Sequence, residues 1–131
     1  MARTGTVLRN TKETQIEVVV NLDGGDVNVK TGIGFFDHML TAFGFYAKIG
    51  LTVQATGDLY VDGHHTVEDV GICLGLALKQ ALGDRAGIRR FGSCYVPMDE
   101  ALTFTALDFS NRPYLVFDAS MPQERIGEYD S

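Results

Sequence analysis

Two stretches of the chain carry apolar residues at helical spacing. In residues 37–47 and again in residues 65–82, apolar side chains recur every three or four positions. This recurrence lines the apolar residues along one face of a helix. Both segments are therefore predicted to be amphipathic helices, the first ended by Gly50 and the second capped by Gly83.

The segments before and between these helices alternate between apolar and polar residues, which is typical of half-buried strands. Residues 14–22 and 27–30 flank the turn signal Asp23-Gly24-Gly25, so that residues 14–30 are predicted to form a hairpin. Residues 51–61 also alternate around a turn at Gly57-Asp58 and predict a further strand or hairpin arm.

Three more strands are predicted after residue 90. They cover residues 91–96, 101–109 and 114–119, with the turn Asn111-Arg112-Pro113 before the last one. The order along the chain is thus strands, helix, strands, helix, strands. This order predicts an α+β fold in which a mixed or antiparallel sheet is covered by helices on one face.

The composition is that of one compact domain in a reducing, cytoplasmic setting. The chain has 131 residues, of which 45% are apolar and 21% charged. The formal charge of −6 argues against nucleic acid or an anionic membrane as the main partner. No secretory leader and no membrane span is expected from the sequence. Cys73 and Cys94 lack metal-ligand spacing and are predicted to be buried, reduced thiols.

The densest candidate chemistry lies at the start of the second predicted helix. On a helix, His64 and Glu68 are four residues apart and His65 and Glu68 three, so that either pair can share a face. Imidazole with carboxylate suits Mn, Fe or Zn. Adjacent histidines point about 100° apart, which favours two metals, or one metal shared with a neighbouring chain. The alternative is a solvated first turn in which Glu68 and Asp69 match the helix dipole.

The third histidine, His38, lies at the start of the first predicted helix. On its own, His38 is most simply a hydrogen-bonding residue at a helix start. The placement of all three histidines at two helix starts favours a metal role. Asp37 is either an N-terminal acid of the helix or the partner that orients an imidazole. Four such ligands cannot saturate two six-coordinate ions, so further donors are expected from other sequence, another subunit, substrate or water.

Arg90 and Arg112 lie at turns beside strands, where a guanidinium can bind a phosphate through two hydrogen bonds. From spacing alone, each is an ordinary surface arginine. Glu13 precedes the first predicted strand and has no chemistry by itself.

Six motifs resemble the imidazoleglycerol-phosphate dehydratase family, in the family's order and over essentially the whole chain. They are RNTKET (9–14), GIGFFDHML (32–40), DGHHTVED (62–69), RRFG (89–92), PMDEAL (97–102) and SNRPYL (110–115).

The resemblance implies a hydro-lyase of histidine biosynthesis that uses two Mn ions per active site. It converts D-erythro-imidazole glycerol phosphate to imidazole acetol phosphate and water, with Mn holding the substrate as an imidazolate. The implied metal ligands are His38, His64, His65 and Glu68. The implied catalytic residues are Glu13 and Glu68, and the implied substrate contacts are Glu13, His38, His64, His65, Arg90 and Arg112.

The resemblance also implies a fold built from an internal repeat, of the ribosomal protein S5 domain 2-like kind. Residues 1–90 would be the first βα repeat with the metal motifs, and residues 91–131 an incomplete second repeat. The family's later His and second His-His-x-x-Glu do not occur in this chain. The family assembles as a homo-oligomer, from trimers to a 24-mer. The alternatives are a catalytically incomplete scaffold of the same fold and, last, a generic metal hydrolase.

Overall fold

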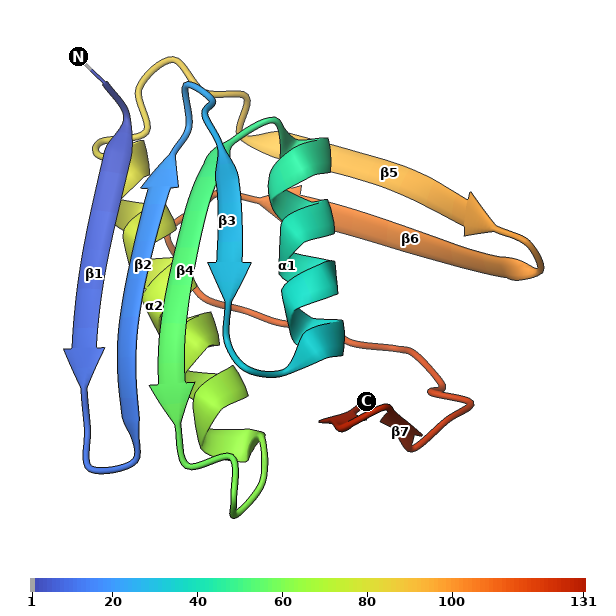
Figure 1. Ribbon diagram of the computed structural model, residues 1–131. Coiled ribbons are helices and arrows are strands. Elements are labelled where there is room, and N and C mark those ends of the chain that lie inside the picture. The colour runs from blue at the N-terminus through green and yellow to red at the C-terminus, as the bar shows by residue number, and fades with distance from the viewer. Residues whose placement is uncertain (1) are drawn as a thin grey trace. The chain divides into compact units, whose positions relative to one another are not determined.

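The computed structural model describes residues 2–131, which form two units (Figure 1). The first unit contains the chain up to Asp84 together with Met121–Ser131, and the second contains Arg85–Ser120. The predicted division at residue 90 into two repeats stays a prediction. Within residues 2–131, no helix combines the length and apolarity that crossing a membrane requires.

The first unit holds a mixed four-stranded sheet and two helices. The strands run in the order β1-β2-β4-β3; β2 is antiparallel to β1 and β4, whereas β3 and β4 are parallel. The predicted α+β class is confirmed. The elements are β1 (Thr4–Asn10), β2 (Thr14–Asn21), β3 (Val27–Lys30), α1 (Gly34–Ala47), β4 (Gly50–Gly57), α2 (His64–Leu82), β7 (Arg125–Ile126) and β8 (Tyr129–Asp130).

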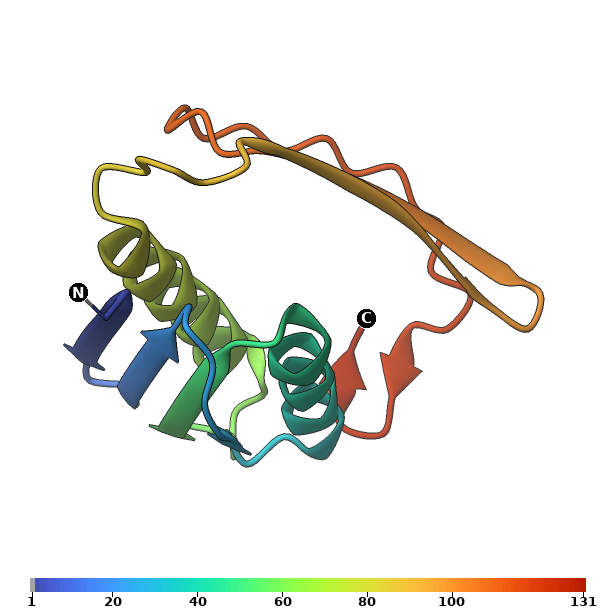
Figure 2. The same ribbon diagram turned by 90° about the horizontal axis from the view of Figure 1, so that it is seen from above.

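Both helices cover the same face of the sheet (Figure 2). The alternation of β2 buries Ile16, Val18 and Val20 on that face, because every second side chain points toward the helices. In β4, Leu51 and Val53 continue the apolar layer, and Val18 and Val53 are register partners. A fully buried valine or leucine contributes about 1.5–3 kcal/mol, so this layer is the main support of the unit.

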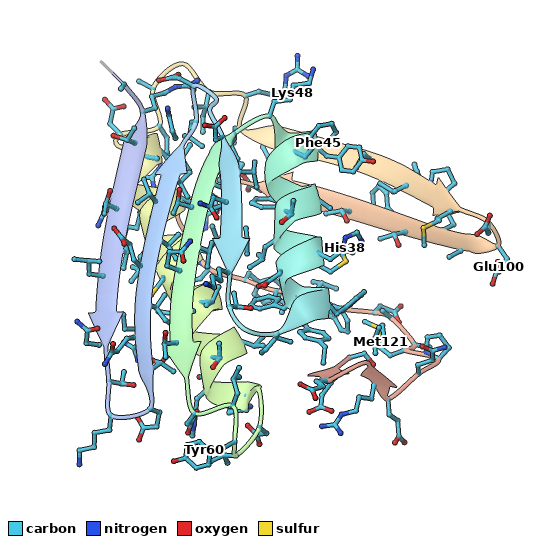
Figure 3. All side chains as sticks on the ribbon, in the orientation of Figure 1. His38, Phe45, Lys48, Tyr60, Glu100 and Met121 are labelled. Atoms are coloured by element: carbon cyan, nitrogen blue, oxygen red, sulfur yellow. The ribbon has the colours of Figure 1, made fainter. Side chains whose placement is uncertain are left out.

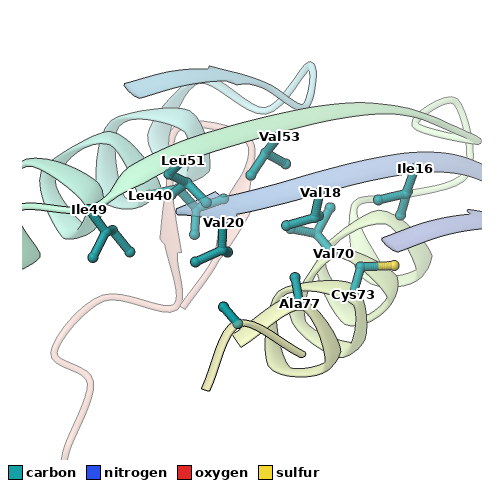
Figure 4. Packing of buried hydrophobic residues seen from close by; sticks show 11 residues of the cluster. Ile16, Val18, Val20, Leu40, Ile49, Leu51, Val53, Val70, Cys73 and Ala77 are labelled. Atoms are coloured by element: carbon teal, nitrogen blue, oxygen red, sulfur yellow. The ribbon is translucent and has the colours of Figure 1, made fainter. Parts of the chain in front are cut away.

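The helices close the core with residues at helical spacing (Figure 4). On α2, the fully buried Val70, Cys73 and Ala77 are three and four residues apart, and α1 adds Leu40. The predicted burial of Cys73 is confirmed, and this burial raises the pKa of its thiol. Gly83 caps α2 as predicted, with φ 54°.

Lys48, not Gly50, ends α1. Lys48 adopts a left-handed conformation with φ 56°, and its N–H donates to the Phe45 carbonyl. Gly50 instead begins β4, where the backbone of Gly24 lies so close that an added Cβ would be 2.9 Å from its carbonyl oxygen. Gly50 thus allows two chain segments to come close together and does not end the helix.

The predicted hairpin over residues 14–30 is wrong. β3 pairs with β4 instead of β2, with Val27 opposite Leu51 and Val29 opposite Val53. After β3 the chain enters α1, and a strand–helix–strand connection returns the next strand parallel to the first. β4 therefore lies beside β3 and occupies the place next to β2.

One local expectation also fails in this unit, and one strand was missed. Residues 59–61, expected to continue a strand or hairpin arm, belong to a turn in which the Val61 N–H donates to the Asp58 carbonyl at 2.8 Å. The edge strand β1 was not predicted from the pattern. Its large apolar residues are the adjacent Val7 and Leu8, which point to opposite faces of the sheet and leave one of them exposed.

The second unit is an antiparallel hairpin of β5 (Phe91–Met98) and β6 (Ala101–Asp108), which confirms two predicted strands. Tyr95 and Phe104 are register partners, and their ring centroids lie 4.7 Å apart. This cross-strand aromatic pair supports the register of the hairpin.

The other two predictions for this unit are wrong. Residues 114–119 are not a strand, because the unit pairs only β5 with β6 and gives them no ladder to join. Cys94 is exposed, because a two-stranded hairpin by itself has no core to cover either face.

Gly5 of β1 offers a test of how closely α2 packs on the sheet. An added Cβ there would lie 2.0 Å from the backbone carbonyl oxygen of Ala77. Because backbone can yield only if the helix shifts, Gly5→Ala should lower the free energy of unfolding by about 2–3 kcal/mol. Chemical denaturation followed by circular dichroism measures this loss.

Gly75→Ala on α2 is the matched control, since nothing lies within 4 Å of a Cβ added there. It should be neutral or stabilise the chain by about 0.5–1 kcal/mol. Equal unfolding free energies for the two variants would contradict the close contact between β1 and α2.

Candidate active site

Three of the predicted site residues lie in the first two turns of α2. His64 begins the helix, and its backbone N–H donates to the Asp62 carboxylate at 2.8 Å. One turn later, Glu68 places its Oε2 3.3 Å from His64 Nε2, as a spacing of four residues predicts. The two side chains are 72% and 58% exposed. A nitrogen donor and an oxygen donor therefore lie together at the surface.

His65 contacts Asp58 rather than Glu68. Its Nδ1 lies 2.9 Å from Asp58 Oδ2, and its ring is inclined by 67° to that of His64. A carboxylate only accepts hydrogen bonds, so the proton between the two groups belongs to Nδ1. The adjacent histidines thus have different partners, as their angular separation on a helix predicts.

The surroundings of His65 are acidic. The hydrogen bond to Asp58 raises the pKa of His65, burial opposes this, and the negative charges of Asp58, Glu13 and Asp62 add to the rise. Glu13, in the loop between β1 and β2, thus adds to the negative charge that acts on His65.

The loop that carries Glu13 is tied to α2 through Asp69. Asp69 is 8% exposed and accepts hydrogen bonds from Arg9 Nε at 2.8 Å and Thr14 Oγ1 at 2.6 Å. These two bonds lower the pKa of the Asp69 carboxyl, the bond from Thr14 most. Within the loop, Thr11 Oγ1 accepts from the N–H groups of Glu13 and Thr14. The helix turn that holds the candidate ligands also anchors the loop.

His38 lies on the exposed surface of α1 (Figure 3). Its ring centroid is 6.3 Å from that of Phe35. Neighbouring Asp37 accepts hydrogen bonds from the N–H and hydroxyl of Thr31, at 2.8 and 2.5 Å. Of the two roles expected for Asp37, these bonds support that of an acid at the start of the helix.

The candidate ligands form pairs rather than a complete set. Across residues 2–131, no group of three or more His, Cys, Asp or Glu side chains is arranged to hold a metal ion. His64 with Glu68 forms one pair, His65 with Asp58 another, and His38 comes from the other helix. Imidazole and carboxylate suit Mn, Fe or Zn, but saturating an ion requires donors from outside each pair.

The His64–Glu68 pair borders a pocket of about 320 Å³. Residues 128–130 contribute to its lining, and Tyr129 stacks on Phe36 with ring centroids 5.8 Å apart. A volume of this size is within the range of small-molecule sites.

Arg90 pairs with Asp108 in the second unit, and the charge of Arg112 also acts on that carboxyl. The Arg90 Nε and Nη2 donate to the two oxygens of Asp108 at 2.7 and 3.1 Å, and its guanidinium lies 4.9 Å from the centroid of the Phe91 ring. The hydrogen bond with Arg90 lowers the pKa of Asp108, and the charge of Arg112 contributes.

Three residues that contact the site were not identified from the sequence: Asp58, Arg9 and Thr14. Arg9 and Thr14 act across a long distance in the chain, since Asp69 is 60 residues from Arg9 and 55 from Thr14, whereas Asp58 is seven residues from His65. The Gly57-Asp58 turn indicates a tight bend but not its partner, and the RNTKET motif (9–14) contains Arg9 and Thr14 without indicating their contact with Asp69.

Fold and site together define an α+β protein with a histidine–carboxylate cluster at the start of a helix. The family model described as "Imidazoleglycerol-phosphate dehydratase" matches residues 31–131. The imidazoleglycerol-phosphate dehydratase of Rhodopseudomonas palustris (strain BisB5) is 59% identical over 130 residues, which are 98% of this chain and 66% of that protein. That of Streptococcus gordonii is 57% identical over 98% of this chain and 67% of its own length.

Solved structures of the same family are also similar to this chain. The crystal structure of imidazoleglycerol-phosphate dehydratase from Staphylococcus aureus superposes with a TM-score of 0.86 at 36% identity, covering 97% of this chain and 70% of that one. The enzyme of Pyrococcus furiosus gives 0.70 at 41% identity, over 88% and 61%. The chain belongs to the imidazoleglycerol-phosphate dehydratase family, and it spans about two thirds of the length of the curated relatives it matches.

Thr14→Val tests the anchor between the Glu13 loop and α2. The change removes the hydroxyl donor from the buried Asp69 carboxylate while keeping the side-chain volume. Hydrogen bonds to charged groups contribute about 1.5–3 kcal/mol, so the free energy of unfolding should fall by about 2 kcal/mol. Thr56→Val, at an exposed position of β4, is the control and should change it by less than about 0.5 kcal/mol. A Thr14→Val chain as stable as the control would refute the anchor.

The Arg90–Asp108 pair predicts a pH dependence. Because Arg90 lowers the pKa of Asp108 in the folded hairpin, the pair stabilises the hairpin fully above the ordinary aspartate pKa, and this stabilisation is lost as the pH falls through the lowered value. In a carbon-13 NMR titration of the Asp108 carboxyl, Arg90→Gln should move the midpoint upward. Arg125→Gln, which breaks an ion pair in the other unit, should leave it unchanged. An unmoved midpoint in Arg90→Gln would contradict the pair.

Proposed function

We propose that the protein carrying this chain is a metal-dependent hydro-lyase of histidine biosynthesis. Its reaction is the conversion of D-erythro-imidazole glycerol phosphate to imidazole acetol phosphate and water. The observation that carries the proposal is the cluster at the start of α2, where His64 pairs with Glu68 and His65 with Asp58, in a chain of the dehydratase family.

The donor chemistry of this cluster fits Mn. His64 Nε2 and Glu68 Oε2 are close enough to share one ion, and imidazole with carboxylate suits Mn. His65 and His38 are the other proposed ligands, for two ions per complete site. When bound, the metal supplies Lewis acidity and a template for the substrate.

Glu13 is the proposed acid/base for the protons that dehydration moves. Its loop is held by Thr11 and by the Asp69–Thr14 bond, and its charge acts on His65. A carboxylate at a fixed place beside the imidazoles can accept a proton from carbon and return one to a leaving hydroxyl. Glu68 is the second proposed catalytic carboxylate.

Arg90 and Arg112 are the proposed ligands of the substrate phosphate. Arg90 is paired with Asp108, so a phosphate would compete with that carboxylate for Arg90. A bidentate guanidinium fixes both the position and the orientation of a phosphate.

We also propose a cytoplasmic homo-oligomer, of the trimer-to-24-mer kind that the family resemblance implies. The proposal is supported by large apolar residues that α1 and α2 leave exposed. They include Met39, Phe43, Phe45, Tyr46, Ile72 and Leu76. Further donors to the metal site would then come from a neighbouring copy.

A catalytically incomplete scaffold of the same fold is the second candidate. It is favoured by the lack, within residues 2–131, of any group of three metal donors. The two candidates differ in turnover and in the number of ions bound per chain.

The deciding experiment incubates the metal-free protein with imidazole glycerol phosphate, with and without Mn²⁺, and follows imidazole acetol phosphate by mass. Turnover should require Mn²⁺ and fall by more than about 100-fold in His64→Ala and in Glu68→Gln. Such a loss of activity exceeds the one expected when a residue that only hydrogen-bonds to a metal ligand is replaced. Asp26→Asn is the control and should keep full activity, because Asp26 is an exposed residue just before β3 and its carbonyl accepts the Leu51 N–H at the start of β4, the end away from the cluster.

Three outcomes would count against the enzyme. Metal-independent turnover would refute the metal role, and full activity of His64→Ala would refute this ligand. No turnover, with fewer than two Mn ions bound per chain, would favour the scaffold.

A further inference from the structure

We infer that Asp58 is a positioning residue for the candidate metal site: it holds His65 with the proton on Nδ1 and so keeps Nε2 as the nitrogen that binds the ion. The metal part of this inference rests on the proposed function. The positioning part rests on the geometry of the turn between β4 and α2.

The hydrogen bond defines the tautomer. Asp58 Oδ2 lies 2.9 Å from His65 Nδ1, and the carboxylate has no proton to donate, so Nδ1 must carry it. In the neutral ring, the lone pair is then on Nε2. A free histidine prefers the opposite tautomer, so the partner decides which nitrogen is available.

The backbone keeps the Asp58 carboxylate in place. Gly57 pairs with Thr14 at the end of β4, and a Cβ added to Gly57 would lie 2.0 Å from Thr66 Oγ1. Glycine therefore lets the first turn of α2 come directly against the strand end. On the other side of Asp58, its carbonyl accepts the Val61 N–H at 2.8 Å. The residue is fixed from both directions.

A structural role alone accounts poorly for the burial of Asp58. Its side chain is 12% exposed, and its Oδ1 is one of two buried side-chain atoms without a hydrogen-bond partner within residues 2–131. A buried, unsatisfied carboxylate oxygen costs free energy. His65, to which the Asp58 carboxylate is paired, is 45% exposed, and ion pairs at such positions stabilise little.

Two other aspartates near the candidate ligands already accept hydrogen bonds from groups other than histidine. Asp37 accepts two hydrogen bonds from Thr31, and Asp69 accepts from Arg9 and Thr14. Asp58 is the carboxylate that contacts a histidine through Nδ1. Metal-binding histidines usually donate their second ring N–H to such a group, and its loss weakens metal binding about 10- to 100-fold.

The first test needs neither metal nor activity. Ring nitrogens of nitrogen-15 histidine are observed by NMR in the metal-free chain at a pH where the rings are neutral, and His65→Gln assigns the His65 signals. In the wild type, Nδ1 should carry the proton. In Asp58→Ala, and to a smaller degree in the isosteric Asp58→Asn, the proton should shift toward Nε2. Asp26→Asn is the charge-matched control and should resemble the wild type.

The second test measures Mn²⁺ binding to the same proteins by titration calorimetry, with folding checked by circular dichroism. Asp58→Ala should weaken binding about 10- to 100-fold. The Asp26→Asn protein should bind like the wild type. A merely structural Asp58 would change stability but neither the tautomer nor the affinity.

The outcomes separate the two proposals. An unchanged His65 tautomer in Asp58→Ala overturns the positioning role, whatever the enzyme does. A changed tautomer with unchanged Mn²⁺ affinity overturns the link to the metal. A wild-type protein that binds no Mn²⁺ overturns the proposed function, and with it the metal part of this inference.

Discussion

The packing of the first turns of α2 against the ends of β2 and β4 is the constraint on which the candidate site depends. Thr66 has no exposed surface and lies against Gly57, while Asp69 is bonded to Thr14. Between these two contacts, the helix can neither rotate nor slide without opening a buried hydrogen bond or closing on a glycine. The residues that face solvent from the same turns, His64 and Glu68, therefore have fixed places although they are exposed.

Features of the fold that depend on neighbouring residues could be predicted from the sequence. The spacing of apolar residues identified both helices, because a helix face is set by positions three and four apart. The His64–Glu68 contact follows from the same geometry. The family resemblance rested on contiguous motifs, and the matching family model and relatives confirm it.

Features of the fold that depend on contacts between distant segments could not be predicted from the sequence. An alternating pattern shows which side of β3 is buried but not which strand pairs with it, and the short turn after β2 favoured the wrong neighbour. The contact of His65 with Asp58 also cannot be predicted from spacing, because the chain between them is mostly a turn and loop with no regular period. Arg90 could be placed at a turn, but its engagement by Asp108 depends on the register of β5 and β6.

The insertion of β4 between β2 and β3 also has a consequence for the order in which the chain folds. The central pairing joins Val18 to Val53, so the middle of the sheet forms last among its parts even though β2 is made early. Until β4 has left the ribosome, β3 and α1 have no strand to dock against, and the apolar face of β2 stays uncovered. Pairings between distant segments are slow to form. The nascent chain therefore passes through a stage with exposed apolar strands, in which chaperone capture and aggregation compete with folding.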